Sequence, residues 1–132
     1  MSRTPGQQAG DEAETIVADR LVAQGWTILG RHVHVGRAEL DLLAVDPGPP
    51  AALVVVEVRR RSRRDFGLAE ETVDRRKQLR LWSAGCVLRD AGCAPDGTRI
   101  PHHPLRVDLV AVEPSRDGSA WLTRHHRWLG RR

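Results

Sequence analysis

The sequence is poor in cysteine and contains no long apolar run. Cys86 and Cys93 are its two cysteines, too few and too far apart in the chain for a zinc site or a disulfide framework. We therefore expect unremarkable free thiols. No apolar segment approaches the ~18 residues of a membrane span, and the N-terminal residues lack the apolar region of a signal peptide. These absences predict a soluble, cytoplasmic protein.

Several catalytic motifs are also missing. The sequence has no P-loop, no Ser-x-x-Lys or Gly-x-Ser-x-Gly nucleophile motif and no internal repeat. Its paired histidines, His102-His103 and His125-His126, are adjacent in the chain, and adjacent side chains diverge on a strand or a helix. We expect these histidines to be solvated rather than to chelate a metal.

What remains is an ordinary globular composition with a basic balance. The chain has 132 residues, 40% of them hydrophobic and 29% charged, which suits one compact α/β domain. The net charge of +4 comes almost wholly from arginine, because Lys77 is the only lysine. A basic balance favours polyanionic partners, although it specifies neither fold nor chemistry.

One apolar stretch dominates the pattern. Residues 51–56 are all apolar, and the last three of them are β-branched valines. Glu57, Val58 and Arg59 follow directly. Such a short run predicts a strand buried on both faces, and alternation places Glu57 and Arg59 on the same side of it. A buried carboxylate is costly unless it is paired, hydrogen-bonded or bound to a metal. The strand therefore ends either in a structural ion pair or in a site.

The remaining pattern predicts the order helix, three strands, helix, strand. We expect a helix over residues 11–24 that ends before Gly25, strands over 26–35 and 38–46 joined by a turn at 36–37, and the strand that ends near Arg59. A second helix over 70–91, a strand over 105–113 and a short strand over 120–123 follow. Residues 1–10 are expected to be flexible, 11–124 to form a single domain and 125–132 to form a basic tail.

Acidic residues recur at the polar ends of these elements. Glu14 lies at the edge of the apolar stripe of the first helix, where a glutamate is usually solvated. In the next hairpin, Glu39 and Asp41 are expected on one face of a strand, with Leu40 and Leu42 on the other. Asp108, in a later strand, is expected to pair with an arginine.

Asp41 and Glu57 fall on consecutive strands that are expected to pair. Two carboxylates that lie close together repel unless a cation or a proton sits between them. Oxygen ligands of this kind suit Mg²⁺ or Mn²⁺, which polarise a phosphoryl oxygen and activate water. With Arg59 on the same side to stabilise developing charge, the pattern permits a phosphodiester-cleaving site. A structural ion-pair network is the alternative.

Cations surround the predicted site in the sequence. Residues 59–64 include five arginines, and beyond Arg59 these are Arg60, Arg61, Arg63 and Arg64. Such a run is either solvated or binds phosphate. On the second helix, Lys77 and Arg80 fall within the apolar stripe, with Arg76 beside them, so they either extend to water or reach a site.

These residues resemble the YraN family, small bacterial proteins related to the PD-(D/E)XK nucleases. The matching pieces run from about Ala13 to Val112: Ala13-Glu14, Gly25-Trp26, Ala38-Glu39-Leu40-Asp41-Leu42-Leu43, Val56-Glu57-Val58-Arg59, Phe66-Gly67, Val73 with Lys77, and Arg106-Val107-Asp108-Leu109-Val110. The resemblance implies a restriction endonuclease-like αβββαβ core with a mixed central sheet flanked by helices. A homodimer is conceivable by analogy with archaeal Holliday-junction resolvases of that shape.

The resemblance also implies a site. It gives Glu14, Asp41 and Glu57 as ligands of Mg²⁺ or Mn²⁺, Glu39 as a neighbouring group and Arg59 as the catalytic cation. Arg59 stands where the related nucleases carry lysine, and arginine cannot deprotonate and is bulkier. Lys77 is our candidate for the missing ammonium. The expected activity is endonucleolytic hydrolysis of DNA; the alternatives are a non-catalytic DNA- or RNA-binding module and an interaction protein whose buried charges are structural.

Overall fold

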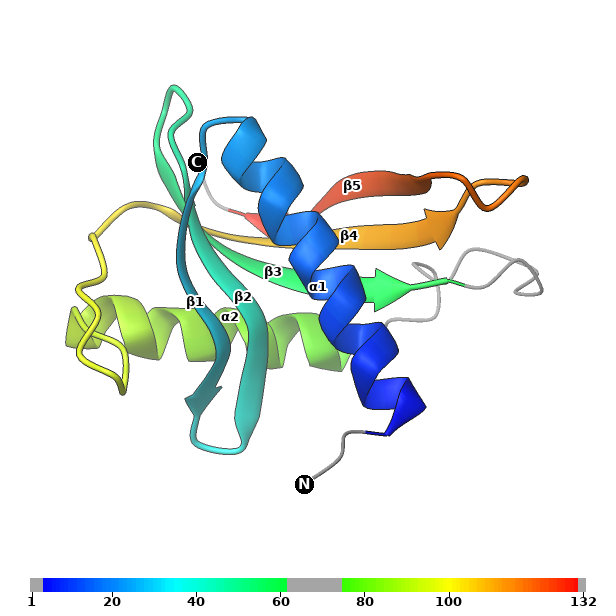
Figure 1. Ribbon diagram of the computed structural model, residues 1–132. Helices are drawn as coiled ribbons and strands as arrows, with labels where there is room; N and C mark the ends of the chain where they lie inside the picture. Colours follow the sequence, from blue (N-terminus) through cyan, green and yellow to red (C-terminus); the bar gives the residue numbers. More distant parts are fainter. Residues whose placement is uncertain (1–3, 62–74, 131–132) are drawn as a thin grey trace.

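The computed structural model describes residues 4–61 and 75–130. Its elements are α1 (Pro5–Ala23), β1 (Thr27–Val35), β2 (Ala38–Asp46), β3 (Ala52–Arg60), α2 (Arg75–Ala91), β4 (Leu105–Pro114) and β5 (Trp121–Gly130). The strands form one sheet in the order β1-β2-β3-β4-β5, in which only β3 and β4 are parallel. The two helices cover opposite faces of this sheet (Figure 1). The predicted α/β architecture, a mixed sheet flanked by helices, is confirmed.

The central strand β3 has an apolar residue at every position from Ala52 to Val56 because it is covered on both sides. Val54 and Val56 belong to the core under α1, whereas Leu53 and Val55 belong to the core under α2. We call these two sides of the sheet the α1 face and the α2 face. The parallel pairing of β3 with β4 requires a crossover between them, and α2 lies on that crossover.

Helix α1 begins at Pro5, so the expected start at Asp11 is wrong, and residues 5–10 belong to the helix rather than to a flexible segment. Thr4 caps it: its hydroxyl accepts from the Gln7 amide at 3.1 Å, and the Gln7 side chain accepts from the Thr4 amide at 2.9 Å. The sequence Thr4-Pro5-Gly6-Gln7 contains this capping-box motif, with proline at the first helical position. The end of the helix was predicted correctly, since Gly25 follows the C-cap with φ of 94°.

Strand β5 is longer than the short strand expected over residues 120–123. It continues to Gly130 and stays paired with β4 along its length, so most of the expected basic tail is strand. The arginines and histidines of β5 obscured its strand pattern, because a strand at the edge of a sheet carries polar side chains that a buried strand would not.

The second helix is described from Arg75, and the expected residues 70–74 lie outside the described part of the chain. It lies close to the sheet: a Cβ added at Gly85 would come within 2.9 Å of the Leu105 side chain and 3.0 Å of Val55. Neither described helix is long and apolar enough to cross a membrane.

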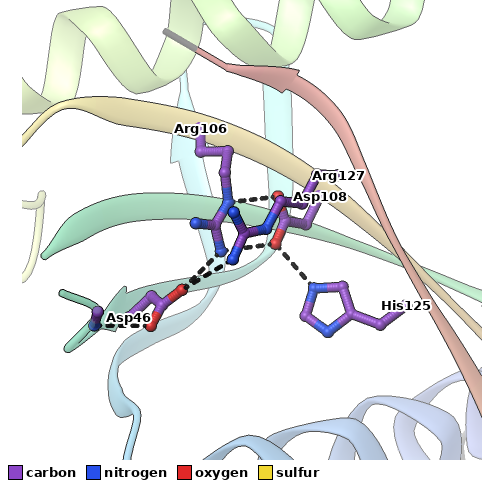
Figure 2. Close-up of polar contacts among 6 residues, drawn as sticks. Asp46, Arg106, Asp108, His125 and Arg127 are labelled. Carbon is purple, nitrogen blue, oxygen red and sulfur yellow. Dashed lines mark hydrogen bonds and ion pairs between the residues drawn. The ribbon is translucent and has the colours of Figure 1, made fainter. Parts of the chain in front are cut away.

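A buried ionic network joins β2, β4 and β5 on the α1 face, as Figure 2 shows. Arg106 donates to both oxygens of Asp108, at 2.8 and 3.0 Å, and to Asp46 at 2.9 Å. His125 Nε2 lies 2.7 Å from Asp108, which has no exposed area. The expected pairing of Asp108 with an arginine is confirmed, whereas the expectation of a merely solvated His125 is wrong.

Candidate active site

The sheet opens where β2 and β3 carry their acidic residues. The β2–β3 ladder ends with the pair Leu42 and Val56, whereas β3 remains paired with β4 up to Arg60. Asp41 and Glu57 would form the next pair of the β2–β3 ladder. In place of a backbone carbonyl, Asp41 Oδ2 accepts the Val58 amide at 2.9 Å. The carboxylate thus satisfies the first backbone donor exposed by the opening.

Asp41 meets charges from both faces of the sheet. Burial raises the pKa of Asp41, and the negative charge of Glu14 on α1 raises it further. The Val58 hydrogen bond and the charges of Lys77 on α2 and His32 on β1 lower it, without cancelling the rise. A carboxylate in this position favours any added positive charge.

Glu57 is buried beside Asp41 and pairs with the only lysine. Its Oε1 lies 2.9 Å from Lys77 Nζ, and the residue is 6% exposed. Burial and the negative charge of Asp41 raise the pKa of Glu57, although Lys77 and Arg59 oppose them. Lys77 therefore does not simply extend to water; its ammonium reaches the carboxylates from the α2 face.

Glu14 brings a third carboxylate from α1. It is 7% exposed, so the solvated position usual for a helix-edge glutamate does not apply here. Its Oε1 lies 2.8 Å from His32 Nε2 and 3.8 Å from Arg31. Burial raises the pKa of Glu14 despite these two cations. We call Glu14, Asp41, Glu57 and Lys77 the carboxylate site.

The regular alternation expected around Asp41 is wrong. Leu42 packs on the α1 face, but Leu40 packs on the α2 face, so the two leucines do not share a side. Their partners on β1 show the same reversal: Arg31, opposite Leu42, contacts α1, whereas Val33, opposite Leu40, packs under α2. Between these partners His32 has φ of 50°, which changes the direction of the strand.

Glu39 is placed beside His32 by this change of direction. Its Oε1 lies 2.8 Å from His32 Nδ1, and its side chain is about half exposed. Glu39 thus contacts the neighbour of Glu14 rather than the Glu57 and Lys77 pair. His32 itself was not among the predicted site residues, because nothing in the sequence marks a non-glycine residue that will take a positive φ.

The predicted cations within the described residues lie at separate places along the end of β3 and on α2. Arg59 follows Glu57 on the same side of β3, and its Nε is buried without a hydrogen bond to the described residues. Arg60 lies over the Trp121 ring at 5.4 Å, and the Arg61 amide donates to Val112. Arg76 and Arg80 are exposed on α2. Arg63 and Arg64 lie outside the described residues.

The donor set fits a hard divalent cation. Burial raises the pKa of all three carboxyls, and the charge of at least one neighbouring carboxylate raises each further, so a divalent cation would relieve an unfavourable charge distribution. Val58 engages one oxygen of Asp41, and Lys77 engages one oxygen of Glu57. The second oxygen of each carboxylate can therefore serve as a ligand, and Mg²⁺ and Mn²⁺ prefer such oxygens.

Together, the sheet topology and the clustered carboxylates define an α/β protein with a restriction-endonuclease-like core. Residues 13–112 match the uncharacterised protein family UPF0102. The chain belongs to this family, and its resemblance to YraN-like proteins is confirmed.

Relatives in the same family cover most of the chain. A UPF0102 protein of Halorhodospira halophila is 42% identical over 114 residues, which are 85% of this chain and 83% of that protein. One of Symbiobacterium thermophilum is 37% identical over 113 residues, covering 85% and 87% of the two chains. A third, of Pseudomonas syringae pv. syringae, is 36% identical over 113 residues, covering 86% and 85%.

Proposed function

We propose that the protein binds DNA and hydrolyses its phosphodiester bonds at the carboxylate site with Mg²⁺ or Mn²⁺. The observation that carries the proposal is the convergence of Glu14, Asp41 and Glu57 from three elements at the point where β2 and β3 separate. Glu14 and Glu57 are buried, Asp41 is half-buried, all three have raised pKa values, and an ammonium contacts Glu57. Such perturbed, clustered groups are typical of functional sites.

The ion would be held by Asp41 and Glu57, with Glu14 beside them. When bound, it would supply Lewis-acid polarisation of a phosphoryl oxygen. The chain's own groups do the rest: the Val58 amide fixes the orientation of Asp41, and Lys77 fixes that of Glu57. Arg59 lies on the same side of β3 as Glu57, where its guanidinium would contact a phosphate oxygen.

Lys77 takes the part that a lysine two residues after Glu57 plays in the related nucleases. It approaches Glu57 from α2 rather than from β3, and thereby compensates for the arginine at position 59. If Lys77 has this role, Lys77→Ala abolishes cleavage. Unchanged cleavage in Lys77→Ala, together with its loss in Arg59→Ala, would assign the role to Arg59 instead.

The arginines near the opening supply the nucleic-acid contacts in this proposal. Arg60 ends β3 and Arg61 follows it, and Arg76 and Arg80 lie on α2 on either side of Lys77. Each phosphate contact contributes a slope of about −0.9 to the dependence of log affinity on log salt concentration. An Arg80→Ala variant should therefore bind more weakly and with a shallower salt dependence.

A second function, DNA or RNA binding without cleavage, is favoured by one observation. Arg59 replaces a lysine, and the available ammonium of Lys77 is already engaged by Glu57 at 2.9 Å. A site in which Glu57 engages the ammonium of Lys77 would bind nucleic acid through the surrounding arginines without activating water. The assay below separates the two functions.

The test uses linear, nicked and four-way-junction DNA with Mg²⁺, Mn²⁺ or EDTA. Wild-type protein is compared with Asp41→Asn and Glu57→Gln, and with Asp19→Asn as an exposed control on α1. Metal-dependent cleavage that is lost in the first two variants and kept in the control supports the enzyme. Salt-sensitive binding without cleavage supports the binding module, and neither activity would refute both functions.

A further inference from the structure

A second group of metal-ligating side chains lies on the α1 side of the carboxylate site. Asp11 and Glu14, three residues apart on α1, face His32 of β1. One ligand atom from each of the three lies within 4.8 Å of the other two. We call these residues and the adjoining Glu39 the His32 cluster. They line a cavity of about 430 Å³, together with Gln7 and Gly10.

The distances in this cluster suit a shared ion. His32 Nε2 lies 2.8 Å from Glu14 Oε1 and 3.6 Å from Asp11 Oδ1. Nitrogen and oxygen ligands bind Zn²⁺ at about 2.0–2.2 Å, which places two ligand atoms of one ion ~3–4 Å apart. The three atoms therefore need only small shifts to coordinate one cation. Asp11 is 33% exposed and His32 40% exposed at the side chain, so an ion can enter from solvent.

Two further features point toward a ligand. The Glu14 side chain is nine-tenths buried, and its Oε1 accepts no hydrogen bond from the described residues, although it faces the cluster. Glu39 contacts the other nitrogen of the ring, Nδ1, at 2.8 Å. In the tautomer whose Nδ1 donates its hydrogen to Glu39, the lone pair of the neutral ring lies on Nε2 and faces the cluster. A carboxylate that orients a ligating histidine in this way is a common feature of metal sites.

We propose that Asp11, Glu14 and His32 bind a divalent transition-metal ion, Zn²⁺ or Mn²⁺, and that Glu39 orients the imidazole. Imidazole nitrogen favours these ions over Mg²⁺ and Ca²⁺, which prefer oxygen alone. The site is distinct from the pair Asp41 and Glu57, although the charge of Glu14 also acts on Asp41. Because binding requires no nucleic acid, the proposal does not depend on the proposed function.

The competing arrangement is a proton on Nε2 of His32, which would make an ion pair with Glu14 and Asp11. Its hydrogen bond to Glu39 raises the pKa of His32, so protons compete with a metal for this nitrogen. The two arrangements differ in a measurable way. Only the metal site produces a saturable, 1:1 uptake of added ion that depends on all three ligands.

The experiment titrates the full-length, metal-stripped protein with Zn²⁺ by calorimetry and with Co²⁺ by visible absorption. We expect one ion per chain at the His32 cluster and, with Co²⁺, a ligand-field band. Both His32→Gln and Asp11→Asn should weaken binding by at least tenfold, and Glu39→Gln by about 10–100-fold. His34→Gln, an exposed histidine on the same strand, is the matched control and should bind as the wild type does.

Circular dichroism establishes that each variant is folded, and Asp11→Asn keeps the test valid if His32→Gln misfolds, because Asp11 is only partly buried. No uptake by the wild type, or uptake unaffected by either variant, overturns the proposal. Uptake that is lost in Asp41→Asn and Glu57→Gln but kept in His32→Gln also overturns it, since the ion would then belong to the carboxylate site. Absence of DNA cleavage would refute only the proposed enzyme.

Discussion

Replacing Asp41 by asparagine is expected to stabilise the metal-free protein at neutral pH. The side chain is half-buried near the carboxylates of Glu57 and Glu14, and its pKa is raised, chiefly by desolvation. Asparagine removes the charge but keeps an oxygen that accepts the Val58 amide, so a hydrogen bond of about 1 kcal/mol is retained. Functional sites commonly hold such unfavourable groups, and their neutralisation raises stability at the expense of activity.

The magnitude follows from opposing charge interactions. At ~5 Å and an effective dielectric constant of about 20, a pair of unit charges interacts with about 3 kcal/mol. Glu14 and Lys77 act on Asp41 with opposite signs, so their effects largely cancel and the desolvation of the carboxylate remains. We expect a net gain of about 1 kcal/mol in the free energy of unfolding, or roughly 4 °C in melting temperature for a chain of this size.

Asp46→Asn is the matched control, because the folded protein stabilises the charged form of Asp46. Although burial acts to raise it, the pKa of Asp46 is lowered by hydrogen bonds from the Gly48 amide and Arg106 and by the charge of Arg106. Loss of a hydrogen bond to a charged group of this kind costs about 1.5–3 kcal/mol. Two aspartates on one strand should therefore respond to the same substitution with opposite signs.

The pH dependence supplies a second check. Between the ordinary pKa of 3.8 and its raised value, native Asp41 binds more protons than the unfolded chain, so wild-type stability falls as pH rises through that window. The advantage of Asp41→Asn should thus be complete above the window and disappear near pH 3.8. The contribution of Asp46 is instead present above 3.8 and lost as pH falls through its lowered pKa.

Urea denaturation in EDTA at several pH values measures these differences. The reasoning is refuted if Asp41→Asn is less stable than the wild type at pH 7.5, or if its advantage persists unchanged at pH 4. Under the proposed function, added Mg²⁺ should stabilise the wild type and leave the variant unaffected, since a ligand stabilises only the form that binds it.

Two further substitutions test the surrounding charges. Lys77→Met leaves buried Glu57 without its ammonium, so the free energy of unfolding should fall by about 1–3 kcal/mol at pH 7.5. The loss should be smaller at lower pH, where Glu57 is protonated. Urea denaturation at both pH values measures the difference, and exposed Arg76→Met is a near-neutral control. Asp108→Leu removes the fully buried partner of Arg106 and should lower the free energy of unfolding by about 3–5 kcal/mol. The exposed control Asp90→Asn should change it by less than ~0.5 kcal/mol. Equal effects of the two substitutions would contradict a structural role for the ionic network around Asp108.

The elements of this fold were largely predictable because their signals are local. The β-branched run before Glu57 predicted a strand buried on both faces, and the stripe of α1 together with Gly25 predicted where that helix ends. The capping box at Thr4 is an equally local signal. Strand β5 was underestimated because edge position, rather than composition, allows its polar residues.

The candidate site was predictable in part. Strand spacing and the family resemblance brought Asp41, Glu57 and Glu14 into one hypothesis, because carboxylates at the ends of neighbouring elements converge when those elements pack. Lys77 was suggested by its place on an inward stripe, but its 2.9 Å contact with Glu57 depends on how closely α2 lies against the sheet.

Only the tertiary structure revealed the His32 cluster. The positive φ of His32 reverses the direction of its side chain relative to the alternation of β1, and a sequence pattern cannot indicate that reversal. The Glu39 carboxylate consequently lies 2.8 Å from the imidazole. The sequence specifies which residue types are available and on which elements they lie. Which of these side chains meet depends on the opening between β2 and β3 and on the positive φ of His32. Both features arise from contacts between elements that are distant in the chain.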